Sequence, residues 1–432
     1  MKVLYSWLKE LVPCDLSVEE MAQGLTMQGL NVEGIEYLGE GLEDIVVGQI
    51  ETYEKHPNAD RLSFCQVTDG EDAHPIVCGA TNHKQGDKVA LALPGTKLPA
   101  FEGKALKKTK IRGVESRGMM CSERELGLSD EHAGIIILPE DAPVGQSFVE
   151  AAGLHDWIIE FENLANRGDC LSALGIAREL AAMVDSEVKM PEWSVHPGKD
   201  EDHSFTIETL DYDLCPRYCA RVIEGVKIGP SPEWMQRRLK ACGIRCINNI
   251  VDISNYVLLE FGHPLHAFDL DTLKDRKIIV RRARPGEKIT TIDDVERPLS
   301  EENLVIADAE RPVALAGVMG GAETEVSEGT VNLLIESAYF DPISIRKTSR
   351  KTGLSTEASY RFERGADWKG LVWACERCTR LIQELAEGQV AGELIDIQPD
   401  SGPHKLEEQS AELRAGRVNQ VLGIHLNSSE TS

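Results

Sequence analysis

The spacing of apolar residues changes repeatedly along the chain, and this change constrains the fold more than any other feature. Residues 1–41 have the spacing of amphipathic helices, residues 42–148 contain short apolar runs between turn residues, and residues 149–195 return to helical spacing. From residue 204 onward, strand-like and helix-like segments alternate. A chain of 432 residues also exceeds what one hydrophobic core usually serves. The sequence therefore predicts a multidomain α+β protein with a helical N-terminal unit into which a β-barrel is inserted.

Residues 42–148 form the predicted barrel. Its apolar runs are short and are separated by Gly, Pro, Asn and Asp, as in closed barrels of oligonucleotide-binding (OB) type. The runs are DIVVGQI, LSFCQVTD, PIVCGAT, KVALALPG and GIIILPE. The pattern alone fits a generic small β domain equally well.

A separate mixed α+β domain is predicted at residues 204–399. The polar, proline-bearing segment 191–204 before it is typical of a linker. Residues 400–432 begin a further element that the chain does not complete.

The charge of the chain bears on its partners. A net charge of −26, from 46 basic and 72 acidic residues, argues at first sight against a nucleic-acid partner. Binding a phosphate backbone needs only a local basic patch, however, and KALKKTKIRGVESR (104–117) and RKTSRK (346–351) are two such patches. No run of about eighteen apolar residues occurs, and the N-terminus lacks the apolar core of a signal peptide. We therefore expect a cytoplasmic protein without a membrane partner.

The eleven cysteines show no disulfide framework, as in reduced cytosolic proteins. Three pairs have spacings that a metal site could use: Cys215/Cys219, Cys242/Cys246 and Cys375/Cys378. The last pair lies in LVWACERCTRLIQELA, where a spacing of three places both thiols on one helix face. We favour packing over zinc, because a closed zinc site needs further ligands.

A second group of polar residues predicts a pocket. Its strings are GIRCINNIVDISNYVLLEFGHPLHAFDLD (243–271), ALAGVMGG (314–321), LIESAYFDP (334–342) and KTGLSTEASYRFERGAD (351–367). No serine or cysteine nucleophile stands beside an evident base, so a hydrolase here would activate water. His263 and His266 could instead be metal ligands on one helix turn. Arg361-Phe-Glu363 is only a fragment of the ATP-site pattern of class II synthetases.

The string HPNADRL at 56–62, followed by VCGATN, KVALALPG and SRGMMCSERELGL, resembles the tRNA-binding family of OB barrels across residues 42–148. The resemblance implies that the barrel contacts tRNA and not DNA. Its candidates for phosphate contact are Arg61, Lys104, Lys107 and Lys108. A solvated loop charge is the alternative for any one of these lysines.

Together with SWLKELV (6–12) and ANRGDCLSALGIARE (165–179), the pocket strings resemble, in this order, the beta subunit of bacterial phenylalanine–tRNA ligase. The resemblance runs to about residue 400 and implies an editing domain that hydrolyses tyrosine wrongly esterified to the phenylalanine tRNA. Carried onto the matching motifs, the catalytic residues are His266, Glu336 and Arg245, and the pocket residues are Gly320, Thr356 and Ala358.

The implied roles follow from what the editing reaction needs. An aminoacylation pocket shaped for phenylalanine cannot strongly reject an analogue that only adds a hydroxyl, so a second site must reject it. Glu336 would accept a hydrogen bond from the tyrosine phenol, while His266 and Arg245 would position the ester or the attacking water. Gly320 would admit the substrate, and the small wall residues would leave room for its ring. The alternative is fold maintenance, with His266 in a helix-starting turn or Glu336 paired to Arg346.

The resemblance also implies partners. The alpha subunit would carry ATP-dependent aminoacylation in a tetramer of two alpha and two beta chains, with the ATP and Mg²⁺ ligands outside this chain and no metal site within it. Residues 400–432 would start a winged-helix-like domain. One alternative is a stand-alone tRNA-binding protein without catalysis, and another is editing in trans.

Overall fold

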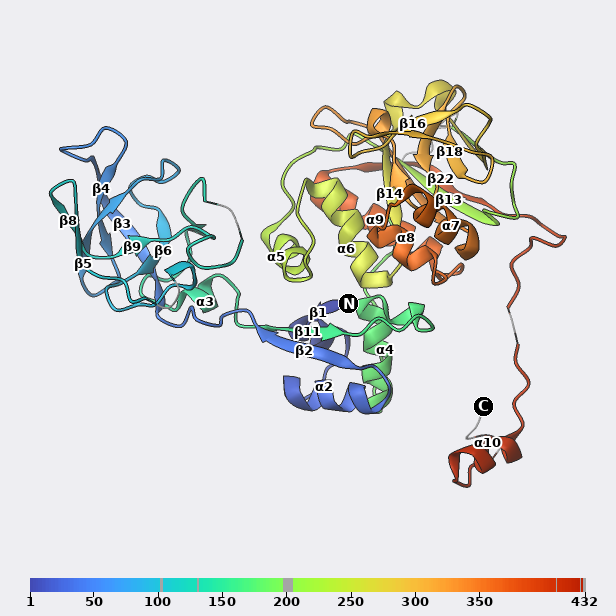
Figure 1. The fold of residues 1–432 in the computed structure, drawn as a ribbon, viewed down its shortest axis with the longest axis horizontal. Coiled ribbons are helices and arrows are strands. Elements are labelled where there is room, and N and C mark those ends of the chain that lie inside the picture. Colours follow the sequence, from blue (N-terminus) through green and yellow to red (C-terminus); the bar gives the residue numbers. More distant parts are fainter. Residues whose placement is uncertain (102–103, 130–131, 197–204, 409, 428, 430–432) are drawn as a thin grey trace. The chain divides into compact units, whose positions relative to one another are not determined.

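The computed structural model describes residues 1–101, 104–129, 132–196, 205–408, 410–427 and 429 (Figure 1). The chain forms two compact units. The first unit comprises Met1–Asn163, Ala173–Pro191 and Arg237–Arg245, and the second comprises Leu164–Ser172, Glu192–Gln236 and Cys246–Ser432. Residues 197–204 of the predicted linker lie outside the described residues.

The N-terminal part of the first unit is a small α/β layer. Its helices are α1 (Tyr5–Leu11), α2 (Val18–Met27) and α4 (Ala173–Met183), and its strands are β1 (Lys2–Leu4), β2 (Val32–Tyr37) and β11 (Trp157–Phe161). Helix α2 begins at a capping box formed by Ser17 and Glu20. The strands form an antiparallel sheet in the order β1-β11-β2.

The N-terminal unit, predicted to be helical, therefore contains a three-stranded sheet in addition to its helices, and the sequence did not predict this sheet. Strand β2 is mostly exposed, so its apolar residues do not alternate in the way that marks a half-buried strand. Its partner β11 lies on the far side of the inserted barrel in the sequence, and local spacing does not reveal such a pairing.

The inserted barrel contains the five predicted strands. Its sheet runs β10-β6-β3-β4-β5, with β9 also paired to β6, and a separate hairpin is formed by β7 and β8. The bounds are β3 (Ile45–Lys55), β4 (Ser63–Thr68), β5 (Ala73–Cys78), β6 (Lys88–Ala92), β7 (Thr109–Ile111), β8 (Val114–Ser116), β9 (Met119–Met120) and β10 (Ile137–Leu138), followed by α3 (Phe148–Ala151). Strand β3 pairs with β6 at one end and with β4 at the other, and a register shift after Ile50 interrupts its ladder to β4.

The second unit is a mixed α+β domain, as predicted, built on two sheets that enclose one core. The first sheet runs β12-β15-β18-β19-β20 and the second runs β14-β21-β13-β22. The first sheet contains β12 (Thr206–Thr209), β15 (Lys277–Arg282), β18 (Leu304–Ala307), β19 (Pro312–Leu315) and β20 (Met319–Gly320). The second contains β13 (Arg217–Glu224), β14 (Leu265–Asp269), β21 (Leu333–Tyr339) and β22 (Gln389–Ile397). Phe268, Leu334 and Ile306 are among the buried side chains between the sheets.

Helices lie beside these sheets (Figure 1). The helices of the second unit are α6 (Asn249–Phe261), α7 (Pro342–Thr352), α8 (Glu357–Phe362), α9 (Leu371–Ala386) and α10 (Ala415–Leu422), and a hairpin is formed by β16 (Lys288–Thr290) and β17 (Glu296–Pro298). Helix α5 (Glu233–Ala241) crosses the boundary between the units. Helices α6 and α9 contact each other and the second sheet. Cys375 and Cys378 are both buried on α9, in the packing role that their spacing predicted. Among the described residues, no helix combines the length and the apolar character needed to cross a membrane.

Candidate functional site

Three polar side chains share the core-facing side of the second sheet. His266 in β14 lies directly opposite Glu336 in β21. Tyr218 in β13 is paired with Ala338, two residues beyond Glu336, so alternation places Tyr218 and Glu336 on the same face. Phe268, which alternation puts on this face as well, belongs to the buried core. Sheet register therefore places this polar group against the apolar core between the two sheets.

Glu336 is held by a short hydrogen bond. The Tyr218 hydroxyl donates to Oε2 of Glu336 at 2.6 Å, and the two side chains are 0% and 7% exposed, respectively. Burial raises the pKa of Glu336 from 4.5 to about 7, although the hydrogen bond from Tyr218 acts in the opposite direction. Burial beside Glu336 also raises the pKa of Tyr218 well above its usual value, so Tyr218 remains a donor. The carboxyl group is thus poised between its neutral and ionised forms near neutral pH.

His266 lies where the edges of the two sheets meet. Strands β14 and β20 are both edge strands, and a Cβ atom on Gly320 would lie 2.4 Å from Cε1 and 2.8 Å from Nε2 of His266. The ring packs edge-on against Phe268 with centroids 4.4 Å apart. Burial lowers the pKa of His266 from 6.5 to about 4, so the imidazole is neutral at pH 7. Among the described residues, its buried Nε2 has no hydrogen-bond partner, and an unsatisfied buried polar atom of this kind marks a candidate functional position.

Thr356 and Ala358 lie at the start of α8, next to the same strand edge. Thr356 is the N-cap of α8, forms a capping box with Ser359, and donates from Oγ1 to the carbonyl of Val318 at 2.9 Å. Ala358 packs partly buried against the core. Thr356 therefore ties α8 to the residues that lead into β20 and Gly320.

Arg245 is placed differently from the other predicted catalytic residues. It is exposed in the loop between α5 and α6 and belongs to the first unit, whereas His266 and Glu336 belong to the second. The predicted catalytic role of Arg245 therefore stays a prediction.

Two of the alternatives from the sequence are also corrected. His266 lies in a strand, so His263 and His266 are not ligands on one helix turn, and His266 is not in a helix-starting turn. Glu336 bonds to Tyr218 rather than to Arg346, whose side chain is exposed on α7. Tyr218 itself was not predicted, because only the register between β13 and β21 reveals its contact with Glu336.

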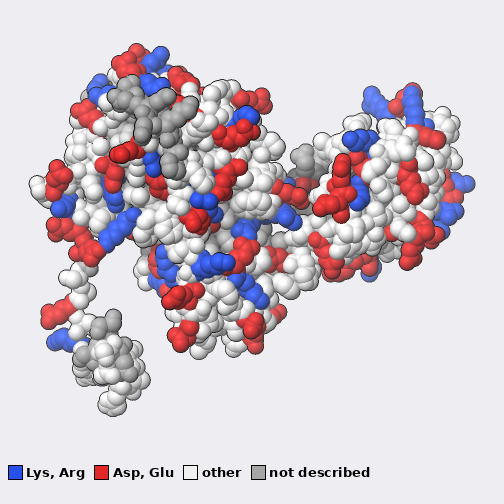
Figure 2. All heavy atoms as spheres, turned by 180° about the vertical axis from the view of Figure 1, so that it is seen from behind, with Lys and Arg blue, Asp and Glu red and all other residues white. Residues whose placement is uncertain are grey.

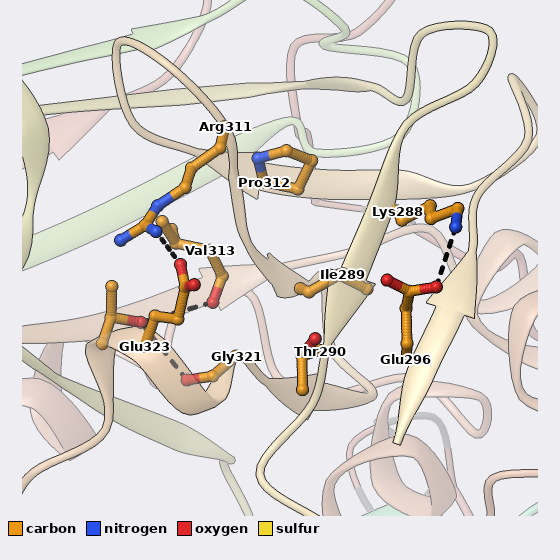
Figure 3. Close-up of a pocket in the computed structure, with 10 residues that line it drawn as sticks. Lys288, Ile289, Thr290, Glu296, Arg311, Pro312, Val313, Gly321 and Glu323 are labelled. Carbon is orange, nitrogen blue, oxygen red and sulfur yellow. Dashed lines mark hydrogen bonds and ion pairs between the residues drawn. The ribbon is translucent and has the colours of Figure 1, made fainter. Parts of the chain in front are cut away.

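A hollow of about 220 Å³ lies elsewhere in the second unit (Figure 3). Its lining is Lys288, Ile289, Thr290, Glu296, Arg311, Pro312, Val313, Gly321, Glu323 and Thr324. Its charged groups are satisfied by one another, since Lys288 pairs with Glu296 at 2.8 Å and Arg311 pairs with Glu323. The hollow adjoins Gly320 through Gly321, but neither His266 nor Glu336 lines it. We therefore place the candidate site at His266 and Glu336 and not in this hollow.

In the barrel, the HPNADRL loop is tied to the β7–β8 hairpin. His56 Nε2 lies 3.1 Å from the carbonyl oxygen of Ile111, and the Asn58 amide donates to the carbonyl of Arg112 at 3.0 Å. Arg112 and Gly113 both have positive φ, as a tight hairpin turn requires. His56 and Asn58 thus have a structural role, and they join the loop that carries Arg61 to the basic hairpin.

The four predicted phosphate-contacting residues of the barrel, Arg61, Lys104, Lys107 and Lys108, are all exposed. Lys110 and Arg112, on the same hairpin, are exposed as well. In Figure 2, acidic and basic side chains are interspersed over the visible face, and several basic ones gather at the outer end of the barrel. A local basic surface therefore coexists with a net charge of −26.

The raised pKa of Glu336 predicts a pH-dependent stability. The folded state retains a proton between pH 4.5 and about 7 that the unfolded state releases, so this stabilising contribution is present below pH 4.5 and is lost as the pH rises to about 7. The full loss is on the order of 3 kcal/mol. We expect Glu336→Gln to remove this pH-dependent loss. The free energy of unfolding of the variant, measured by urea titration, should therefore rise relative to that of the wild type as the pH increases from 4.5 to about 7.

Two features make this titration specific. The pKa of His266, lowered to about 4, has the opposite effect, because its stabilisation is lost as the pH falls from 6.5, so the difference between Glu336→Gln and wild type isolates Glu336. Tyr218→Phe removes the bond that lowers the pKa of Glu336 and should extend the window to higher pH. A difference between Glu336→Gln and wild type that does not vary with pH would contradict the assignment.

Comparison with known proteins links these features to two domain families and a set of relatives. Residues 45–147 match the family described as a tRNA binding domain, and residues 214–387 match the B3/4 domain family. Both the barrel and the group around Glu336 lie within these matches. A solved N-terminal fragment of a phenylalanyl-tRNA synthetase beta subunit from Pyrococcus horikoshii is similar at 16% identity and a TM-score of 0.32, over 64% of this chain and 75% of that one.

Curated relatives match over the entire chain. The phenylalanine–tRNA ligase beta subunit of Geobacter metallireducens is 52% identical over 434 residues, which cover 100% of this chain and 53% of the relative. Those of Moorella thermoacetica and Salinibacter ruber are 48% and 45% identical, covering 99% and 100% of this chain and 53% of each relative. The chain thus spans about half the length of the curated relatives it matches. Along its whole length the chain is therefore similar to about half the length of phenylalanine–tRNA ligase beta subunits, and it matches both the tRNA binding domain and the B3/4 domain families.

Proposed function

We propose that the group around Glu336 is an editing site that hydrolyses tyrosine wrongly esterified to the phenylalanine tRNA. The observation that carries the proposal is the buried carboxyl group of Glu336, which holds the Tyr218 hydroxyl on one oxygen and stands beside a neutral histidine opposite a glycine. The carboxylate of Glu336 already accepts a hydrogen bond from one phenol hydroxyl, that of Tyr218. A tyrosine side chain presents the same group, whereas phenylalanine would leave the carboxylate without that bond.

The residues divide the reaction between recognition and water activation. Glu336 would accept the substrate phenol on the oxygen that Tyr218 does not occupy. Neutral His266, whose Nε2 lacks a partner among the described residues, would hydrogen-bond the attacking water or the ester carbonyl. With a pKa of about 4, His266 is a weak base, so it would orient water rather than carry the whole proton transfer.

The remaining predicted residues would shape the pocket. Gly320 lets the His266 ring pack closely against the sheet edge, and Thr356 and Ala358 would form the adjoining wall. Arg245 is exposed outside this group, and its contact with the ester stays a prediction.

The roles proposed for the rest of the chain rest on its similarity to phenylalanine–tRNA ligase beta subunits. We propose that the barrel binds the phenylalanine tRNA through its basic hairpin, with Arg61, Lys104, Lys107 and Lys108 contacting phosphates. We further propose a cytoplasmic assembly of two alpha and two beta chains in which the alpha chain uses ATP and Mg²⁺ for aminoacylation. Arg361, in the string that resembles an ATP-site fragment, does not fit such a site, because it is buried and donates to the carbonyl of Leu171 and to Glu357.

A deacylation assay tests the editing proposal. The full chain, with and without an alpha chain, should release tyrosine from Tyr-tRNA(Phe) much faster than phenylalanine from Phe-tRNA(Phe). His266→Ala should slow the release by roughly 10- to 100-fold, the range for loss of a positioned hydrogen-bonding group. A chain that binds the tRNA but leaves Tyr-tRNA(Phe) intact would show a tRNA-binding protein without catalysis. Unchanged release in His266→Ala would remove His266 from the site.

A further inference from the structure

Helix α7 carries a cationic stripe that neither the barrel nor the editing pocket explains. Its outward positions are Ile343, Arg346, Lys347, Arg350 and Lys351, all exposed and spaced as one helical face. Its sequence, PISIRKTSRKT, contains no acidic residue. In a chain with a net charge of −26, an exposed face with four cations and no carboxylate of its own is unusual, because surface helices commonly intersperse both signs.

Most of these cations lack an internal partner. Lys351 pairs with Glu302 at 3.0 Å and also donates to Ser300. Glu302 has its pKa lowered chiefly by Lys351 and more weakly by Lys347. Within the part of the chain that the structure describes, the side chains of Arg346, Lys347 and Arg350 form no hydrogen bond or ion pair.

Stabilisation of the helix accounts for only part of the stripe. Arg350 and Lys351 lie in the last turn, where cations interact favourably with the helix dipole. Arg346 and Lys347 lie before that turn, where the dipole effect has faded. The inner face of the helix does the packing, since Ser344, Ile345 and Thr348 are buried.

Helix α7, which carries the stripe, packs against elements of the candidate editing site. Ile345, on the inner face of α7, packs near Gly317 in the turn between β19 and β20, the turn that precedes Gly320. At its C-terminal end α7 stops at Gly353, and the chain reaches Thr356, at the pocket wall, within a short loop. Helices α7 and α8 contact each other. Figure 1 shows α7 beside α8 in the second unit.

We propose that Arg346, Lys347 and Arg350 bind the phosphodiester backbone of the RNA strand whose 3′ end carries the amino-acid ester, and guide that end into the pocket. The proposal rests on the proposed editing function. The ester to be cleaved is attached to a polyanionic strand, which must pass close to the pocket mouth. Arginine and lysine on adjacent helical turns, about 5.4 Å apart, offer cations to successive phosphates. This surface is separate from the basic hairpin of the barrel, which belongs to the other unit.

The experiment uses the full chain and an RNA minihelix with the acceptor-stem sequence of the phenylalanine tRNA and a single-stranded 3′ end. The variant is Arg346→Gln, Lys347→Gln and Arg350→Gln together, because glutamine keeps helix propensity while removing charge. The control is Lys274→Gln, Arg276→Gln and Arg284→Gln, which removes the same charge from the same unit at positions outside α7. Binding of the minihelix without an attached amino acid is followed by fluorescence anisotropy at several salt concentrations.

We expect the α7 variant to bind the minihelix roughly 10-fold more weakly and to lose about 2 from the slope of log K against log salt, while the control binds as the wild type does. With a tyrosyl minihelix, KM should rise by a similar factor and kcat should stay unchanged, because the residues do not touch the reacting atoms. Equal losses in the variant and the control, unchanged binding in the variant, or no binding by the wild type would each overturn the proposal. If binding depends on α7 but no tyrosine is released, the RNA-binding role of α7 stands and the editing function is rejected. If tyrosine is released and the α7 variant has an unchanged KM, the editing function stands and the role of α7 is rejected.

Discussion

Replacing Glu336 with alanine is expected to lower kcat/KM for release of tyrosine from Tyr-tRNA(Phe) by roughly 10- to 100-fold, the value of a hydrogen bond to a charged group. Release of phenylalanine from Phe-tRNA(Phe) should change little, because that side chain makes no such bond. The selectivity of the site should therefore collapse rather than its activity on all esters. The measurement is the ratio of the two kcat/KM values for the variant and the wild type.

The pH dependence of selectivity gives a second measure of Glu336. With a pKa of about 7, the wild-type carboxyl becomes neutral as the pH falls, and its affinity for the substrate phenol should fall with it. We expect the preference for tyrosine over phenylalanine to decline between pH 8 and 6 in the wild type. Glu336→Gln, which is neutral throughout, should show a low preference that does not vary with pH. A preference that varies with pH alike in both proteins would assign the titration to another group.

A loss of activity in Glu336→Ala must be separated from a loss of stability. Removing the carboxyl group leaves the buried Tyr218 hydroxyl without its acceptor, at a cost of about 1–3 kcal/mol. The double variant Tyr218→Phe with Glu336→Ala removes both partners, so it should regain part of that stability. It should not regain selective release of tyrosine. Recovery of selectivity in the double variant would mean that Glu336 acts only through the fold.

The second large effect is expected from Gly320→Ala. A Cβ atom at this position would lie 2.4 Å from Cε1 of His266, closer than side chains can approach, so the imidazole must move. A displacement of about 1 Å at a catalytic group can lower the rate about 100-fold. We expect a loss of that order in kcat for release of tyrosine and a destabilisation of about 1–3 kcal/mol.

The control for this substitution is Gly229→Ala in the same unit. A Cβ atom on Gly229 would meet nothing within 4 Å, and neither glycine has positive φ, so the two substitutions share the same backbone cost. The double variant Gly320→Ala with His266→Ala should recover stability, because the clash is gone, but not activity. If Gly320→Ala retained wild-type release of tyrosine, His266 would not need its observed position, and the proposed water-orienting role would fail.

Local sequence predicted much of the architecture. The five barrel strands were predicted because each is a short apolar run bounded by turn residues, and helix α2 because its apolar residues have helical spacing. The three-stranded N-terminal sheet was not predicted, since β2 is largely exposed and pairs with β11 across the inserted barrel. Such an exposed strand lacks the alternation of apolar and polar residues, so it can be recognised only from its pairing with another strand.

The candidate site divides in the same way. Motif strings pointed to His266, Glu336, Gly320 and Thr356 as one group, but the sequence could not state how they meet. The bond from Tyr218 to Glu336 joins residues 118 positions apart, and it depends on the register between β13 and β21. The contact between Gly320 and His266 depends on two sheet edges meeting.

What the sequence determined by itself was the family resemblance, the barrel and a set of candidate site residues, because these depend on local patterns of residue types. The tertiary structure decided the chemical state of the candidate site. It buried Glu336 so that its pKa rises to about 7, and it keeps His266 neutral. Desolvation and strand register act between distant segments, so no local pattern encodes them.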